Sequence, residues 1–163
     1  MRIEYAKARD WNALFRQVDW EEGLMASHWH PGFGEWVWHP DSLGYFNGFE
    51  PGDTIGKREA WKFINDVTKD SASEKHYRLY GEGEDAYLFL SCEGASTRSP
   101  WLLWHHVQHM WIESFWLGPA GEQYGKEDHT LDEFQNMFDQ AREISHEEAE
   151  EYMITAEDIP EVI

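Results

Sequence analysis

Residues 101–111 read WLLWHHVQHMW, a run that places His105 and His109 four residues apart, with Glu113 four residues further on. If this segment is helical, the three side chains stand one turn apart on the same face. Imidazole and carboxylate groups at this spacing can bind one transition-metal ion such as zinc. Additional ligands would have to come from other parts of the chain. The available histidines are His28, His30 and His39.

The surrounding sequence weakens this metal-site hypothesis. In the short signature of zinc proteases a glutamate follows the first histidine as general base, whereas here that position is His106. The chain has no second HxxxH pattern, no CxxC pair, no Walker-type phosphate loop and no GxSxG elbow. We therefore favour histidines that fill an aromatic core and bind no cofactor. Two alternatives remain open: a small metal-dependent enzyme that uses His105, His109 and Glu113, and a pH-responsive or catalytic histidine.

Charge is the strongest global signal in the sequence. The chain of 163 residues has 32 acidic and 13 basic side chains, a formal net charge of −19. Residues 122–163 hold 14 of the acids and only two bases, Lys126 and Arg142. Direct nucleic-acid binding is not expected, because binding to phosphates requires clustered lysine and arginine. An acidic surface of this kind either keeps the protein soluble or meets a basic partner.

Three segments have clear local patterns. Residues 1–6 predict a short strand. The segments 75–80 and 86–92 are apolar runs separated by a Gly- and Asp-containing loop, which indicates a β-hairpin. Residues 52–70 predict a helix with four side chains facing inward, Ala60, Trp61, Ile64 and Val67.

Three further segments give more ambiguous patterns. Asp10 can cap a helix whose apolar residues have helical spacing, Trp11, Leu14, Phe15 and Val18. Residues 28–50 predict a β-hairpin, in which EWVWH and YFNGF flank a PDSLG turn. Residues 100–117 predict a Trp-rich central helix, since Ser99 and Pro100 form a typical helix start. A pair of strands through residues 100–117 is the alternative, because tryptophan, valine and isoleucine favour strands.

The acidic C-terminal segment has two capping boxes. Thr130 and Glu133 form the first, and Ser145 and Glu148 form the second, which either starts a new helix or continues the first with a bend. One apolar stripe accompanies them, made of Leu131, Phe134, Met137, Phe138, Ala141 and Ile144. The apolar residues of the tail 155–163 predict that it docks on the body of the protein.

No internal repeat or linker is visible, so residues 1–163 predict one α+β domain. We expect an antiparallel sheet from two hairpins, packed with the Trp-rich helix and an acidic helical segment from about residue 130 to residue 163. The single cysteine and the absence of an apolar N-terminal stretch predict a cytoplasmic protein without a membrane span.

The sequence favours a small acidic protein that binds and occludes a basic partner, one that itself handles nucleic acid. Phage anti-defence proteins, DNA mimics and immunity proteins against nuclease toxins share this acidic composition, an analogy without any residue-level match. A virion or assembly component, which would form a homo-oligomer, is a further alternative. The aromatic loops around Phe33 and Trp36 are a second candidate interface. The predicted partner-binding residues are Asp132, Asp139, Glu143, Glu147, Glu148, Glu150 and Glu151.

Overall fold

The computed structural model describes residues 2–21, 23–68, 74–92, 99–106, 109–117 and 129–153. Within these residues the strands form one sheet of ten strands, and four short α-helices pack around it. The architecture is α+β, as the sequence predicts. The sheet is larger than the two predicted hairpins and is mixed instead of antiparallel, because one of its strand pairs, β4 with β9, is parallel.

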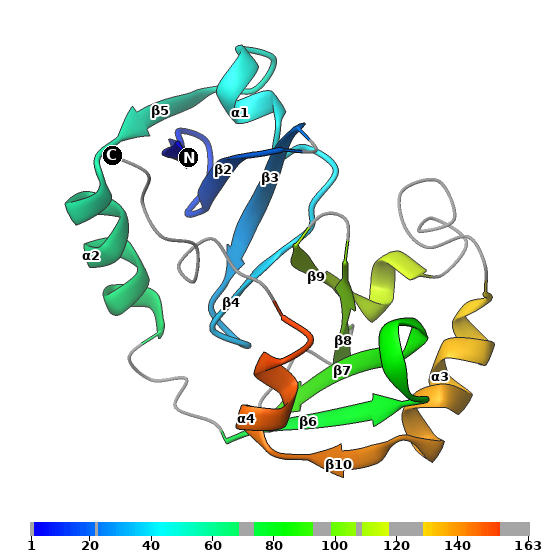
Figure 1. Ribbon diagram of the computed structural model, residues 1–163. Helices are drawn as coiled ribbons and strands as arrows, with labels where there is room; N and C mark the ends of the chain where they lie inside the picture. Colours follow the sequence, from blue (N-terminus) through cyan, green and yellow to red (C-terminus); the bar gives the residue numbers. More distant parts are fainter. Residues whose placement is uncertain are drawn as a thin grey trace.

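The first half of the chain supplies five adjacent strands and two helices. Figure 1 shows them together, in blue to blue-green. Its elements are β1 (Ile3–Ala8), β2 (Leu14–Trp20), β3 (Gly23–His30), β4 (Glu35–Val37), α1 (Gly44–Asn47), β5 (Gly52–Ile55) and α2 (Lys57–Thr68).

The second half supplies the other five strands and the remaining helices, drawn in green to orange in Figure 1. Two short 3₁₀ helices, η1 and η2, belong to this half. Its elements are β6 (Lys75–Tyr80), η1 (Gly83–Asp85), β7 (Tyr87–Cys92), β8 (Trp101–His105), β9 (Met110–Glu113), η2 (Ser114–Leu117), α3 (Leu131–Gln140), β10 (Arg142–Ile144) and α4 (His146–Glu150).

The two halves repeat one topology. The strand order across the sheet is β10-β6-β7-β8-β9-β4-β3-β2-β1-β5. Each half is therefore a four-stranded meander whose last strand lies at the centre, followed by a helix, a fifth strand that pairs with the first, and a final helix. The equivalent strands β4 and β9 pair in parallel through Val37 and Trp111, and the N–H of Trp38 donates to the carbonyl of Trp111 over 2.7 Å.

In each half, the two helices cover opposite faces of the sheet. Tyr45 of α1 shares a cluster with Ala6 of β1, whereas Ala60 of α2 shares one with the neighbouring Tyr5. Phe134 of α3 shares a cluster with Phe89 of β7, whereas Ala149 of α4 shares one with the neighbouring Leu90.

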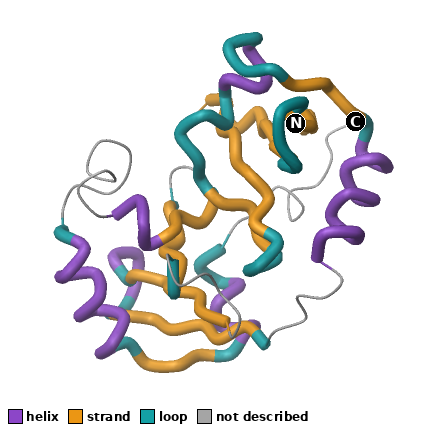
Figure 2. The backbone as a smooth tube through the Cα atoms, turned by 180° about the vertical axis from the view of Figure 1, so that it is seen from behind, coloured by secondary structure: helices purple, strands orange, loops and turns teal. Residues whose placement is uncertain are grey.

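Trp36 of β4 packs in one cluster with Ala60 and Ile64 of α2, while its neighbour Val37 shares a cluster with Ala149 of α4. Successive strand residues point to opposite faces, so α2 and α4 lie on opposite faces of the sheet. Figure 2, which views the molecule from behind, shows the helices in purple around the strands in orange. The final helix of the first half and the final helix of the second half therefore lie on opposite faces of the sheet.

Several local predictions are confirmed. A strand begins near the N-terminus, α2 forms with Ala60 and Ile64 buried, and β6 pairs with β7. Trp61 is an exception, because its side chain is 40% exposed instead of inward-facing. The predicted start of the helix at residue 52 is wrong, because residues 52–55 form β5, which pairs with β1. Both capping boxes are present, and Ser145 begins a separate helix. The predicted docking of the tail lies outside the described residues.

Three predicted elements are wrong. Residues 14–20 form a strand, β2, whose residues are buried on both faces, so its apolar positions imitate helical spacing. Within 28–50, β4 pairs with β3, and the chain then forms α1 instead of a second hairpin strand. The central Trp-rich helix does not exist. Residues 101–105 and 110–113 form the antiparallel pair β8 and β9, as in the alternative, because their aromatic and branched side chains fill both faces of a buried sheet.

Candidate partner-binding surface

Most of the predicted partner-binding residues lie on or beside one edge of the sheet, whereas Asp132, at the start of α3, lies near the ends of the inner strands β8 and β9. Strand β10 is the edge strand, and α3 and α4 directly precede and follow it in the chain. Arg142 is the only lysine or arginine between residues 129 and 153. We call this region the acidic edge. Six of the seven predicted side chains are exposed there, Asp132, Asp139, Glu143, Glu147, Glu150 and Glu151.

The start of α3 is fixed by a capping network. The hydroxyl of Thr130 accepts the N–H of Glu133 over 3.2 Å, and His129 Nδ1 lies 2.8 Å from a carboxylate oxygen of Glu133. These bonds hold the pKa of Glu133 below its usual value, with His129 as the largest cause. The Glu133 carboxylate is therefore ionised at neutral pH and held in one place.

Helix α4 begins in the same way, at the other side of β10. The hydroxyl of Ser145 accepts the N–H of Glu148 over 3.1 Å. Glu148 is half-buried and forms an ion pair with Arg142 over 2.9 Å. Its charge is therefore partly neutralised. The other acids of α4 keep more of their charge available, although His146 lies 3.3 Å from Glu150.

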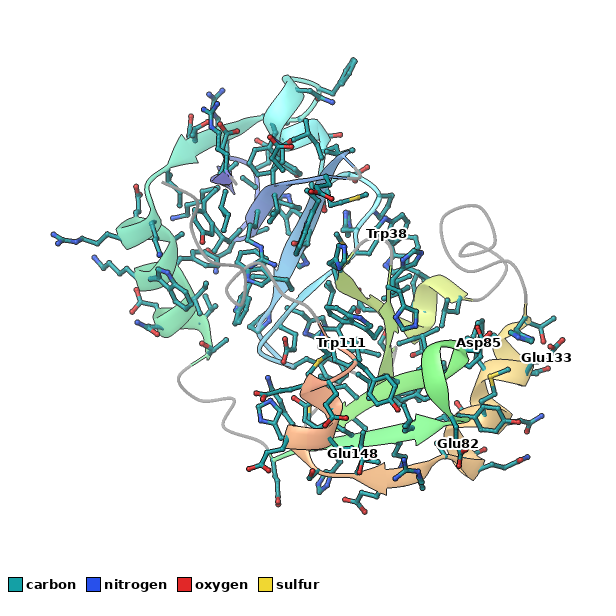
Figure 3. The ribbon with its side chains drawn as sticks, in the orientation of Figure 1. Trp38, Glu82, Asp85, Trp111, Glu133 and Glu148 are labelled. Atoms are coloured by element: carbon teal, nitrogen blue, oxygen red, sulfur yellow. The ribbon has the colours of Figure 1, made fainter. Side chains whose placement is uncertain are left out.

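The turn between β6 and β7 adds further carboxylates on the side of the molecule where α3 lies. Glu82 and Asp85 are exposed residues of the turn between β6 and β7. Just after this turn, Tyr87 packs against the rings of His129 and Phe134 at the α3 end. Figure 3 labels Glu82, Asp85 and Glu133 on this side of the molecule. Sequence reasoning missed these carboxylates, because only the fold of the β6–β7 hairpin brings them beside α3.

The residues of the metal-site hypothesis do not converge. His105 pairs with Met110, and Glu113 pairs with Leu102, so His105 and Glu113 point to opposite faces of the sheet. His109 lies in the turn between β8 and β9 with a φ of 54°, and its ring stacks on Trp20 with the ring centres 4.0 Å apart. The helical spacing that this hypothesis required is absent. Among the described residues, no group of three or more His, Cys, Asp or Glu side chains could hold a metal ion.

Another group of histidines gathers where the two halves meet. His30 of β3 lies 3.4 Å from Glu113 of β9, and both side chains are largely buried. The ring of His28 packs against Phe15 and His39. The pKa of His28 is lowered to about 4, mainly by burial and also by the neighbouring imidazoles of His39 and His30, while Glu113 opposes this shift. His28 is therefore a neutral component of the core at neutral pH.

The second candidate interface is buried. Phe33 is 2% exposed and packs in the core of the second half, and Trp36 is 8% exposed under α2. Neither ring can be an anchor for a partner in this conformation. The large apolar side chains that do reach the surface include Leu43, Phe49 and Phe115.

Comparison of this chain with family models, curated proteins and solved structures gives no match. No helix within the described residues is long and apolar enough to cross a membrane.

Proposed function

We propose that this chain is a small acidic binding protein that occludes a basic protein partner through its acidic edge. The observation that carries the proposal is the gathering of exposed carboxylates on α3, β10 and α4, where Arg142 is the only lysine or arginine. Arg78 of the adjoining strand β6 lies opposite Glu143, but its guanidinium is engaged by the carbonyl and the ring of Phe138. Because α3 and α4 cover opposite faces of the sheet, the carboxylates extend around the edge from one face to the other. A partner that grips this edge would meet negative charge on both sides.

The mechanism has two stages. Long-range attraction first steers a cationic surface towards the acidic edge and raises the association rate, an effect that salt screens. Contact then removes water from a few anchors, which supply most of the binding free energy.

A nucleic-acid-handling enzyme fits as the partner, since its binding surface is built to hold rows of phosphates. The Thr130 and Ser145 caps fix the starts of the two helices that carry the carboxylates, and these carboxylates would compete for the same cationic side chains. Binding of this kind blocks the partner without any chemical step, as phage anti-defence proteins, DNA mimics and immunity proteins do.

The test is charge reversal at the acidic edge. A variant carrying Glu143→Lys, Glu147→Lys, Glu150→Lys and Glu151→Lys should lose a partner that co-purifies with the wild-type chain from its native host. Its association rate should fall by about tenfold or more, and the wild-type rate should fall as salt is raised from 0.05 to 0.5 M.

The control applies the same change of charge to the first half of the chain. The variant reverses four exposed acids, Asp10, Glu21, Glu59 and Asp66, to lysine. It should bind the partner nearly as well as the wild-type chain at 0.15 M salt. Equal losses in the two variants would mean that only the total charge matters, and no loss in either would refute an acidic docking edge.

A further inference from the structure

A pocket of about 300 Å³ opens between η2 and the first turns of α3. The geometry points to this pocket as the site that receives one lysine or arginine side chain of the basic partner. This inference rests on the proposed function and adds a specific anchor to it. The pocket is lined by Pro100, Ser114, Phe115, Leu131, Asp132 and Gln135.

The first observation is an unsatisfied hydroxyl group. Ser114 is only 4% exposed, and its Oγ has no hydrogen-bond partner within the part of the chain that the structure describes. Buried polar atoms are rarely left without a partner, because the loss of hydration is then not offset. Rotation of the Ser114 side chain about its Cα–Cβ bond would turn Oγ towards the pocket, where a ligand that donates a hydrogen bond to it would remove this cost. Ammonium and guanidinium groups are pure donors.

The other walls suit a cation with an apolar stem. Asp132 places a carboxylate in the first turn of α3, and among the residues that the structure describes no lysine or arginine lines the pocket. The ring of Phe115 is 40% exposed, so it can stack on a guanidinium or cover the methylene groups of lysine. Leu131 adds a second apolar surface. The combination of one charge, one hydroxyl and an aromatic ring matches a basic side chain.

The pocket is also held in shape before any ligand arrives. The amide oxygen of Gln135 accepts the Trp101 indole N–H over 2.8 Å, and the amide nitrogen of Gln135 donates to Asp139 over 3.1 Å. On the opposite wall, the N–H of Phe115 donates to the Ser99 hydroxyl over 3.3 Å. A preformed pocket loses little conformational freedom on binding, which favours affinity.

An anion is a less suitable ligand, although α3 begins at this pocket. A free helix N-terminus attracts anions, but here the Thr130 hydroxyl already accepts the N–H of Glu133. The carboxylates of Asp132 and Glu133 also occupy the first turn. The local charge is therefore negative, and it selects a cation.

The first half of the chain has a comparable pocket without the acid. Ser42, which lies between β4 and α1, is 1% exposed with an unpartnered Oγ and is followed by the exposed Leu43. In the same way, Ser114 follows β9 and precedes the exposed Phe115. The pocket at Ser42 has a volume of about 90 Å³, and none of the described residues that line it carries a carboxylate. It provides a matched control within the same protein.

The experiment uses the full chain and three Gly/Ser nonapeptides that differ only at the central residue. That residue is arginine, its neutral isostere citrulline, or norleucine. Amide shifts in ¹H–¹⁵N spectra are followed up to about 10 mM peptide. The arginine peptide should shift Ser114, Phe115 and Gln135, and it should bind about fivefold or more tightly than the citrulline peptide, as expected for one ion pair in a partly exposed site.

Three variants connect the binding to the named atoms. Asp132→Asn should lower the affinity for the arginine peptide about fivefold and leave the affinity for the citrulline peptide unchanged. Ser114→Ala should weaken the arginine peptide, whereas Ser42→Ala should leave its affinity unchanged. The spectra of the free variants show in the same samples that each one is folded.

Other results would overturn the inference. Equal affinities of the arginine and citrulline peptides would make the pocket merely apolar, and shifts confined to β10 and α4 would place the cation elsewhere on the acidic edge. Absence of binding at 10 mM would show that the pocket takes no basic side chain. None of these results affects the partner's response to charge reversal at Glu143, Glu147, Glu150 and Glu151, so the proposed function is judged separately.

Discussion

The two halves of the molecule share one topology and differ in charge. Residues 1–68 hold seven basic and eleven acidic side chains, whereas residues 74–163 hold five basic and twenty acidic ones. The formal charges are therefore −4 and −15. The contrast is sharpest at equivalent helices. Helix α2 carries Lys57, Arg58 and Lys62, while α4 carries no lysine or arginine.

This comparison separates what the fold determines from what the side chains determine. The meander, the edge strand and the flanking helices recur in both halves, so they reflect how the sheet is built. The negative charge is restricted to one copy of the arrangement. Since topology alone carries no specific function, the charged edge is the feature that distinguishes the second half.

The halves also differ in how they depend on one another. The loop between β3 and β4 belongs to the first half, but its Phe33 is buried with Tyr77 and Leu90 of the second. Lys75 of β6 reaches back to Glu35 over 2.6 Å and to the carbonyl of Gly34 over 3.3 Å. The first half therefore completes the core of the second half.

The largest expected effect tests this dependence. Phe33→Ala should lower the free energy of unfolding by about 3–5 kcal/mol, because it removes a fully buried ring and leaves a cavity. Phe49→Ala is the control, since its ring is 85% exposed, and it should change stability by less than about 0.5 kcal/mol. Chemical denaturation of both variants measures the difference. A small effect of Phe33→Ala would mean that the two cores are independent.

A slightly smaller effect is the loss of folding stability at acid pH caused by His28. The folded-state pKa of His28 is about 4, below its ordinary value near 6.5. Above pH 6.5 the residue is neutral in both states and contributes nothing to pH dependence. As the pH falls from 6.5 towards 4, the unfolded chain binds a proton that the folded chain refuses, so stability is lost. The total loss from this residue is about 3 kcal/mol.

Two measurements check the behaviour of His28. Unfolding free energies between pH 7.5 and pH 4 should fall steadily, and His28→Gln should flatten this part of the curve. The imidazole resonance of His28 should titrate near pH 4 in the folded protein. A midpoint at pH 6 or above would show that the contacts with Phe15 and His39 leave the ring hydrated.

The success of the sequence-based predictions depended on how local each signal was. The caps at Thr130 and Ser145 and the β6–β7 hairpin are written within a few consecutive residues, and the structure contains them. Strand β2 and the pair β8–β9 were misassigned, because strands buried on both faces lose the alternation of polar and apolar residues that marks a strand.

The candidate site shows the same limit. Composition selected the acids of α3, β10 and α4, but it gave no sign that they surround one sheet edge from both faces. The pocket combines Ser114 with Asp132, eighteen residues apart, and its main signal is a hydroxyl without a partner. Such a feature exists only in the folded chain. The repeat of topology was likewise invisible, since the two halves share an order of elements but no evident sequence pattern.

The smallest expected effect concerns the caps that hold the acidic edge in place. Thr130→Ala and Ser145→Ala each remove one side-chain acceptor for a backbone N–H, and each should cost about 1 kcal/mol of stability. Helix α3 has ten residues and α4 only five, so loss of the Ser145 cap should open α4 without disturbing α3. Hydrogen exchange should therefore show faster opening of α4 alone in Ser145→Ala, while Thr130→Ala should also loosen Asp132 at the pocket. If the two variants instead lowered the affinity for the arginine peptide equally, the peptide would be responding to the charge of the whole edge. The cation would then bind a diffuse acidic surface and not a specific pocket.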